Sequence, residues 1–175
     1  MPNRRYTGNS DGAAQGRRAG MTVFIREIER LSDKGLWNNG DWLVRNMKGK
    51  QSLSVHATGR AVDLSYRFMP NHKDASNSKG KQNGRAIALQ WCKILRQHQD
   101  AVGLEMIIDY FPEPYGRAWM CDRRSWVKYQ RPMVSGAPKG DWLHIEISPA
   151  MADDPAAMRA AFAVIEQQLN SQPDG

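Results

Sequence analysis

The chain has 175 residues, of which 41% are hydrophobic and 25% are charged, as in one soluble globular domain. No apolar run is long enough to span a membrane. The first 20 residues are polar, basic and rich in glycine, without the apolar stretch of a signal peptide. We therefore expect no membrane span and synthesis in the cytosol, with any action outside the cell depending on release by another agent.

The net charge of +7 indicates attraction to polyanions. Nucleic acid and a bacterial wall rich in carboxylates and phosphates are both candidates, and charge alone does not choose between them. The lysines and arginines are dispersed, and no known nucleic-acid-binding motif is present. A specific nucleic-acid partner is therefore not expected.

The N-terminal part is predicted to be a flexible basic arm over residues 1–20, followed by a helix. The helix begins near Met21, because Phe24, Ile28 and Leu31 recur on one helical face, and it ends at residues 33–35. Residues 38–40 (Asn-Asn-Gly) predict a turn. Asp41 is then a candidate cap for a short helix that reaches about Met47.

The middle of the chain is predicted as loop and then strand over residues 53–66, followed by a long exposed loop over residues 70–84. Residues 85–98 form the clearest predicted helix. Strands are expected at 104–111, 116–121, 123–129 and 142–148. A last helix is marked by Asp154 as its cap and by a buried face of Met158, Phe162, Ile165 and Leu169.

Strands that follow one another through turns, mixed with helices, favour an α+β fold with an antiparallel sheet and flanking helices. We expect one domain over residues 21–170, a flexible tail at 171–175 and a monomer. Cys92 and Cys121 have no C-x-x-C partner and are expected to be reduced, buried thiols, although the sequence leaves a disulfide between them open.

Two stretches carry residues suited to metal chemistry. In the first, His56 and Asp63 lie on either side of Gly59, which permits a tight turn that can bring an imidazole and a carboxylate together. In the second, His144 and Glu146 share one face of a predicted strand. Two histidines, one aspartate and a water would form a catalytic zinc site, although His144 taken alone is more consistent with a core histidine.

The first stretch, from Ser54 to Asp63, matches every fixed position of the S-x-H-x-x-G-x-A-x-D pattern of zinc peptidases. It resembles the D-Ala-D-Ala carboxypeptidase family with the Hedgehog-type fold. The second stretch is similar to the family's second motif, an acidic residue three positions before the last histidine ligand. That acid is Asp141 here, which resembles the phage endolysins that cleave L-alanyl-D-glutamate bonds.

The resemblance implies that His56, Asp63 and His144 bind zinc and that Asp141 is the general base for the attacking water. Ser54 and Arg60 lie beside the ligands and are candidates for substrate binding, and Arg60 can equally be an exposed residue. Glu146 is the reserve candidate for the base or for a partner of a metal ligand. His72 and His98 have no ligand spacing, and we expect them to be a solvated loop residue and a helix residue.

The expected function is therefore zinc-dependent hydrolysis of peptidoglycan stem peptides by a bacteriolytic phage endolysin, made in the host cytoplasm and acting on the cell wall after release. A D-Ala-D-Ala carboxypeptidase or dipeptidase is the alternative within the family. A zinc-stabilised wall-binding module without catalysis is the alternative from another class. The acid at Asp141 argues against the inactive module.

Overall fold

The computed structural model of the chain describes residues 3–47, 49, 51–70, 79–132 and 134–171. Its framework is a six-stranded antiparallel sheet with the strand order β1-β2-β6-β3-β4-β5. The strands are β1 (Trp37–Gly40), β2 (Ala61–Ser65), β3 (Leu104–Asp109), β4 (Arg117–Met120), β5 (Ser125–Lys128) and β6 (Trp142–Ile147). The predicted α+β class with an antiparallel sheet and flanking helices is confirmed.

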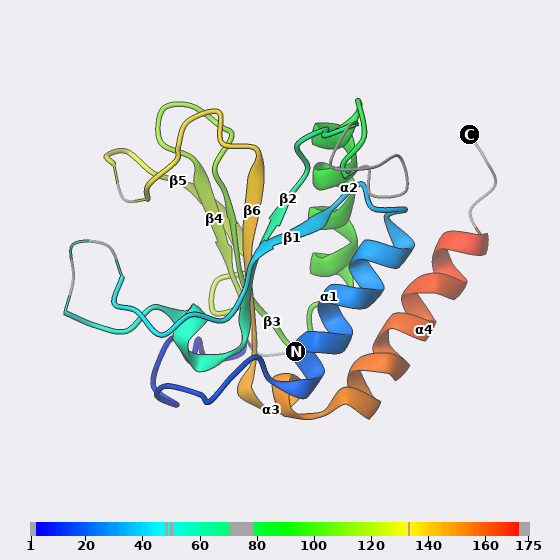
Figure 1. Ribbon diagram of the computed structural model, residues 1–175, viewed down its shortest axis with the longest axis horizontal. Coiled ribbons are helices and arrows are strands. Elements are labelled where there is room, and N and C mark those ends of the chain that lie inside the picture. The colour runs from blue at the N-terminus through cyan, green and yellow to red at the C-terminus, as the bar shows by residue number, and fades with distance from the viewer. Residues whose placement is uncertain (1–2, 48, 50, 71–78, 133, 172–175) are drawn as a thin grey trace.

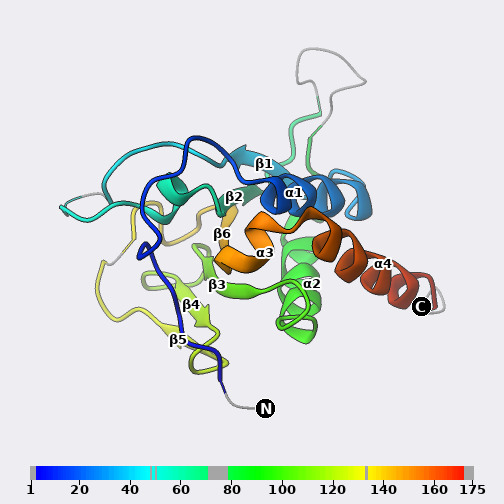
Figure 2. The same cartoon turned by 90° about the horizontal axis from the view of Figure 1, so that it is seen from below.

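Helices cover one face of this sheet (Figure 1). They are α1 (Ala19–Leu31), α2 (Gly84–Gln97), α3 (Pro149–Asp153) and α4 (Pro155–Ser171), and a short 3₁₀ helix, η1 (Val55–Thr58), precedes β2. Because side chains alternate along a strand, Leu143 and Ile145 of β6 face the helices and join the main core. Figure 2 shows the N-terminal segment on the other side of the sheet from α2 and α4.

Most predicted elements are present. The helices predicted from Met21 and from Arg85 correspond to α1 and α2, and the strands expected after residue 104 correspond to β3 to β6. Asp154 caps α4 as predicted, since its carboxylate accepts hydrogen bonds from the backbone amides of Ala156 and Ala157. The short α3, capped by Ser148, was not predicted.

Two predictions near residue 40 are wrong. Residues 38–40 end strand β1 instead of forming a turn, and none of residues 41–47 is helical. Leu43 and Val44 are both about half exposed, at 53% and 52%, so a helix there would have no buried apolar face to stabilise it. The carboxylate of Asp41 instead binds Arg17 and the side chain of Asn38.

Parts of two other predictions fall outside the described residues. Residues 71–78 of the predicted loop and residues 172–175 of the predicted tail are not described. The flanks of the loop are joined by backbone hydrogen bonds between Met69 and Lys79, and Gly80 donates to the carbonyl of Lys34. Within the described part of the chain, no helix has the length and apolar character needed to cross a bilayer.

Candidate metal centre

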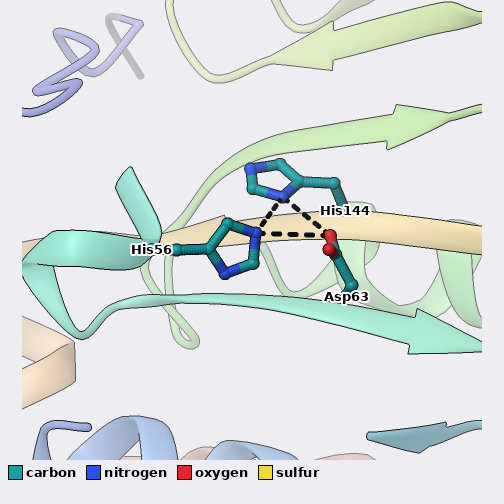
Figure 3. Close-up of side chains that lie close together, drawn as sticks. All are labelled: His56, Asp63 and His144. Carbon is teal, nitrogen blue, oxygen red and sulfur yellow. Dashed lines mark hydrogen bonds and ion pairs between the residues drawn. The ribbon is translucent and has the colours of Figure 1, made fainter. Parts of the chain in front are cut away.

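Three side chains from separate elements meet on the face of the sheet that the helices leave open. His56 projects from η1, Asp63 from β2 and His144 from β6, and all three point toward one another (Figure 3). Asp63 and His144 are direct partners across the β2–β6 ladder, which places their side chains on the same face. The residues predicted as metal ligands are thus brought together as a group that can hold a metal ion.

The spacing of the donor atoms fits a small divalent cation. Nδ1 of His144 lies 3.0 Å from Oδ1 of Asp63 and 3.1 Å from Nε2 of His56. Nε2 of His56 lies 3.4 Å from the same carboxylate oxygen. Zinc bonds of about 2.0–2.1 Å in a tetrahedron place neighbouring donors about 3.3 Å apart. The three donors therefore already outline one face of such a tetrahedron.

Each histidine is fixed by a hydrogen bond at the ring nitrogen that faces away from the group. Nδ1 of His56 lies 2.5 Å from the backbone carbonyl of Asp41, and Nε2 of His144 lies 2.9 Å from a carboxylate oxygen of Glu146. The other oxygen of Glu146 accepts a 2.7 Å hydrogen bond from the hydroxyl of Tyr6. Such outer contacts are what orients imidazole ligands in metal sites.

The electrostatics of the group favour a positive charge between the carboxylates. Burial opposes protonation of His144, but hydrogen bonds to Asp63 and Glu146 outweigh it and raise the pKa of the imidazole to about 10. Burial also opposes ionisation of Asp63, yet hydrogen bonds from His144 and His56 lower the pKa of its carboxyl group well below the usual range. The surroundings that attract a proton here also attract a metal cation, which must displace that proton.

The group remains open to solvent on one side. His56 and His144 are buried, whereas the Asp63 side chain keeps 21% of its surface exposed. Next to it lies an apolar cluster around Ile108, which is the direct cross-strand partner of His144. In this cluster the rings of Tyr110 and Trp142 pack at 4.7 Å. Tyr110 is buried, and Trp142 is the partly exposed ring of the pair.

Gly59 allows the turn between His56 and Asp63, as expected, and it has a second role that the sequence did not indicate. Its φ of 74° is in the left-handed region, where its amide closes η1 on the carbonyl of His56. A Cβ at this position would lie 2.3 Å from the carbonyl oxygen of Gly16. The glycine therefore also permits close approach of the N-terminal segment.

Gly59→Ala is expected to destabilise the protein by about 2–4 kcal/mol, since it combines left-handed strain with a backbone clash. Gly12→Ala is the matched control, because Gly12 has a φ of 75° but nothing within 4 Å of an added Cβ. The control should lose only about 1–2 kcal/mol. Urea unfolding of the two variants measures the difference, and equal losses would contradict the predicted clash.

The structure gives the two proposed substrate-binding residues other contacts. Ser54 is buried and caps η1, where its hydroxyl accepts a 3.3 Å hydrogen bond from the amide of His56. Arg60 is 0% exposed, so the predictions of a substrate contact and of an exposed side chain are both corrected. Its guanidinium is held by Asp11, Glu105 and the backbone carbonyls of Gly8 and Ile147.

The proposed base, Asp141, lies immediately before β6 and is not one of the three candidate metal donors. Its backbone carbonyl accepts hydrogen bonds from the amide of Tyr66 and the hydroxyl of Ser65. Its carboxylate forms a two-point ion pair with Arg67, at 2.6 and 3.0 Å. Asp141 is thus held at the end of the β2–β6 ladder with its carboxylate partly exposed.

Glu146, the reserve candidate for the base, contacts His144, one of the three candidate ligands. It is buried, and its two oxygens are used by His144 and Tyr6. Of the other histidines, His98 joins α2 to α4 through a hydrogen bond to Gln168, and His72 lies outside the described residues. Cys92 and Cys121 are free and buried thiols, as expected.

Two contacts of the centre were missed by sequence reasoning. Asp41 contributes through its backbone carbonyl, which every residue possesses, so no residue type could have indicated it. Tyr6 reaches Glu146 across 140 positions of the sequence. The only signal for Tyr6 was an aromatic residue within an otherwise polar basic segment.

Comparison of the chain with protein-family models, with curated proteins and with solved structures gave no match.

Proposed function

We propose that this protein is a zinc-dependent peptidase that hydrolyses peptide bonds in the stem peptides of bacterial peptidoglycan, of the endolysin type that cleaves L-alanyl-D-glutamate bonds. The observation that carries the proposal is the convergence of His56, Asp63 and His144, with donor atoms 3.0–3.4 Å apart. The sequence pattern around these residues, which resembles that of the carboxypeptidase and endolysin family, supplies the reaction class.

The donor set favours a catalytic over a purely structural site. Structural zinc sites are usually closed by four protein ligands, most of them cysteines, whereas catalytic sites use three ligands and keep one position open. The group here has three donors, two imidazoles and a carboxylate, with Asp63 partly exposed. A bound zinc would supply Lewis acidity, activating water and polarising a peptide carbonyl.

Other residues of the chain would then orient the ligands and transfer protons. The carbonyl of Asp41 and the carboxylate of Glu146 orient the two imidazoles. Asp141 is the proposed proton acceptor for the attacking water and the donor to the leaving amine. Its ion pair with Arg67 involves a side chain that is 53% exposed, so separating the two charges costs at most about 1 kcal/mol.

The proposed substrate is consistent with the remaining features of the molecule. A net charge of +7 favours adsorption to an anionic wall. The partly exposed ring of Trp142, which packs on the buried Tyr110 beside the donors, offers an apolar contact to the hydrocarbon parts of a peptide. Peptidoglycan is therefore the proposed partner.

Digestion of purified peptidoglycan, with mass analysis of the products, tests the proposal. We expect zinc-loaded protein to expose new amino groups on D-glutamate and to leave L-alanine on the glycan strand. Release of free D-alanine would instead assign the carboxypeptidase alternative, and hydrolysis of free D-alanyl-D-alanine, without cleavage of the wall, would assign the dipeptidase alternative. Binding to the wall without any soluble fragment would assign the inactive wall-binding module and overturn the proposed activity.

A further inference from the structure

Residues 3–18 contact the outer side of the candidate metal centre at several separate points. The amide of Ala14 donates to the carbonyl of Ala57, and the amide of Arg18 donates to the carbonyl of Gly59. These two backbone hydrogen bonds, at 2.8 and 3.0 Å, bracket the end of η1, the element that carries His56. The segment 3–18, here called the N-terminal arm, is therefore attached directly to one ligand-bearing element.

The arm also supports the loop that contacts His56 from behind. The indole nitrogen of Trp42 donates to the carbonyl of Ala14, and Arg17 forms a 2.7 Å ion pair with the carboxylate of Asp41. The backbone carbonyl of the same Asp41 lies 2.5 Å from Nδ1 of His56. The position of this carbonyl, and with it the orientation of the imidazole, thus depends on contacts with the arm.

The other end of the arm contacts His144 indirectly, through Glu146. The hydroxyl of Tyr6 donates to Glu146, whose other oxygen is bonded to Nε2 of His144. Burial and the neighbouring Glu146 carboxylate both raise the pKa of the Tyr6 phenol, so the hydroxyl keeps its proton and remains a donor. This gives an unbroken chain of hydrogen bonds from Tyr6 through Glu146 to His144.

Buried charges anchor the arm between these two ends. Arg60, which is completely buried, binds Asp11 of the arm at 3.1 Å and Glu105 of the sheet at 3.1 Å. Thr7 of the arm donates a 2.6 Å hydrogen bond to Glu105. Removing the arm would leave these charges short of partners, which is costly in a protein interior. The arm is therefore a packed part of the domain.

We propose that the N-terminal arm is a built-in positioning element for the metal centre, with Tyr6 as a positioning residue that holds His144 through Glu146 while residues 14–18 hold His56 from the opposite side. The proposal rests on the metal site of the proposed function, but not on the reaction. Because energetic coupling between two sites is reciprocal, bound metal should also hold the arm more firmly on the domain.

Metal affinity tests the positioning role of Tyr6. Tyr6→Phe removes only the hydroxyl, and Thr7→Val is its matched control, since it removes a neighbouring hydroxyl that binds Glu105 and not Glu146. Competition with a chromophoric chelator should show zinc binding weakened about ten-fold in Tyr6→Phe, the lower end of the effect of outer-shell partners. Thr7→Val should bind zinc as the wild type does.

The visible spectrum of the cobalt-substituted protein adds a readout that a merely structural role would not move. The Co²⁺ absorption bands should shift in Tyr6→Phe and remain unchanged in Thr7→Val, because only the first change alters the orientation of His144. Equal zinc affinity and equal Co²⁺ spectra in Tyr6→Phe and wild type would overturn the proposal. Equal losses in both variants would also overturn it, because the arm would then act through general packing.

Hydrogen exchange of the unmodified protein tests the reciprocal effect without any variant. Zinc should slow exchange of the arm amides, including those of Ala14 and Arg18, at times when the amides of α2 are unaffected. Arm exchange that is unchanged by zinc would count against the coupling.

Wild-type protein that takes up neither zinc nor cobalt would refute both the positioning role of the arm and the proposed function. Metal binding without peptidoglycan cleavage would refute only the proposed function.

Discussion

His144→Ala is expected to abolish stoichiometric zinc binding and to remove the stability that the metal confers. The variant loses one of three donors and leaves Asp63 and Glu146 without the imidazole that separates them. Metal that binds only the folded state stabilises it by about 4 kcal/mol at a thousand times its dissociation constant. Metal analysis should find one zinc per wild-type chain and less than a tenth of that in the variant.

His98→Ala is the matched control for this experiment. His98 is a half-buried histidine whose side chain bonds Gln168, and it joins α2 to α4, away from the three donors. The control should keep its zinc, and a chelator should lower its melting temperature as it does that of the wild type. The melting temperature of His144→Ala should not respond to the chelator. Full zinc content in His144→Ala would contradict the assignment of His144 as a ligand.

The three candidate metal donors were named by the motif resemblance, and local patterns specify where each of these side chains points. Gly59 permits the turn that brings η1 back toward β2, and strand alternation places Asp63 on the open face of the sheet. The same alternation separates His144 from the buried Leu143 and Ile145 on either side of it. Only the pairing of β2 with β6 had to be supplied by the fold.

The contacts of Arg60 could not be predicted from the local sequence. An arginine next to the candidate metal ligands suggests a contact with substrate. A buried arginine would need charged or polar partners. Its partners Asp11 and Glu105 lie 49 and 45 positions away in the sequence, and nothing in the local pattern identifies them. The contacts of the N-terminal arm were missed for the same reason, because its polar composition is as compatible with solvent as with a buried ion-pair network.

The region around Asp41 was mispredicted because propensity competes with packing. Asn, Gly and Asp are favoured in turns and at helix caps, so the local sequence indicates a turn followed by a helix. In the structure Trp37 is buried and β1 pairs with β2, which keeps the chain extended as far as Gly40. The backbone of Asp41 is then placed against His56, and its carboxylate is used by Arg17.

Asp141→Asn is expected to lower peptidoglycan cleavage by about 10²–10⁴-fold while leaving the zinc content unchanged. The substitution keeps the shape of the side chain and one hydrogen-bond acceptor for Arg67, but it removes the proton acceptor. Asp141 contributes no donor atom to the metal group, so zinc should remain bound by His56, Asp63 and His144. Initial rates on purified peptidoglycan, together with metal analysis, measure both quantities.

Glu146→Gln distinguishes the role of proton acceptor, proposed for Asp141, from the role of a residue that orients a metal ligand. Glu146 contacts His144 on the side away from the metal donors, so its loss should weaken zinc binding about 10–100-fold, and activity should recover when excess zinc is added. Activity of Asp141→Asn should not recover under the same conditions.

If Asp141 only anchors Arg67 at the end of the β2–β6 ladder, Asp141→Asn will be nearly silent, since an exposed ion pair contributes about 1 kcal/mol or less. Near wild-type turnover in Asp141→Asn would therefore exclude this carboxylate as the base and remove the main likeness to the endolysins.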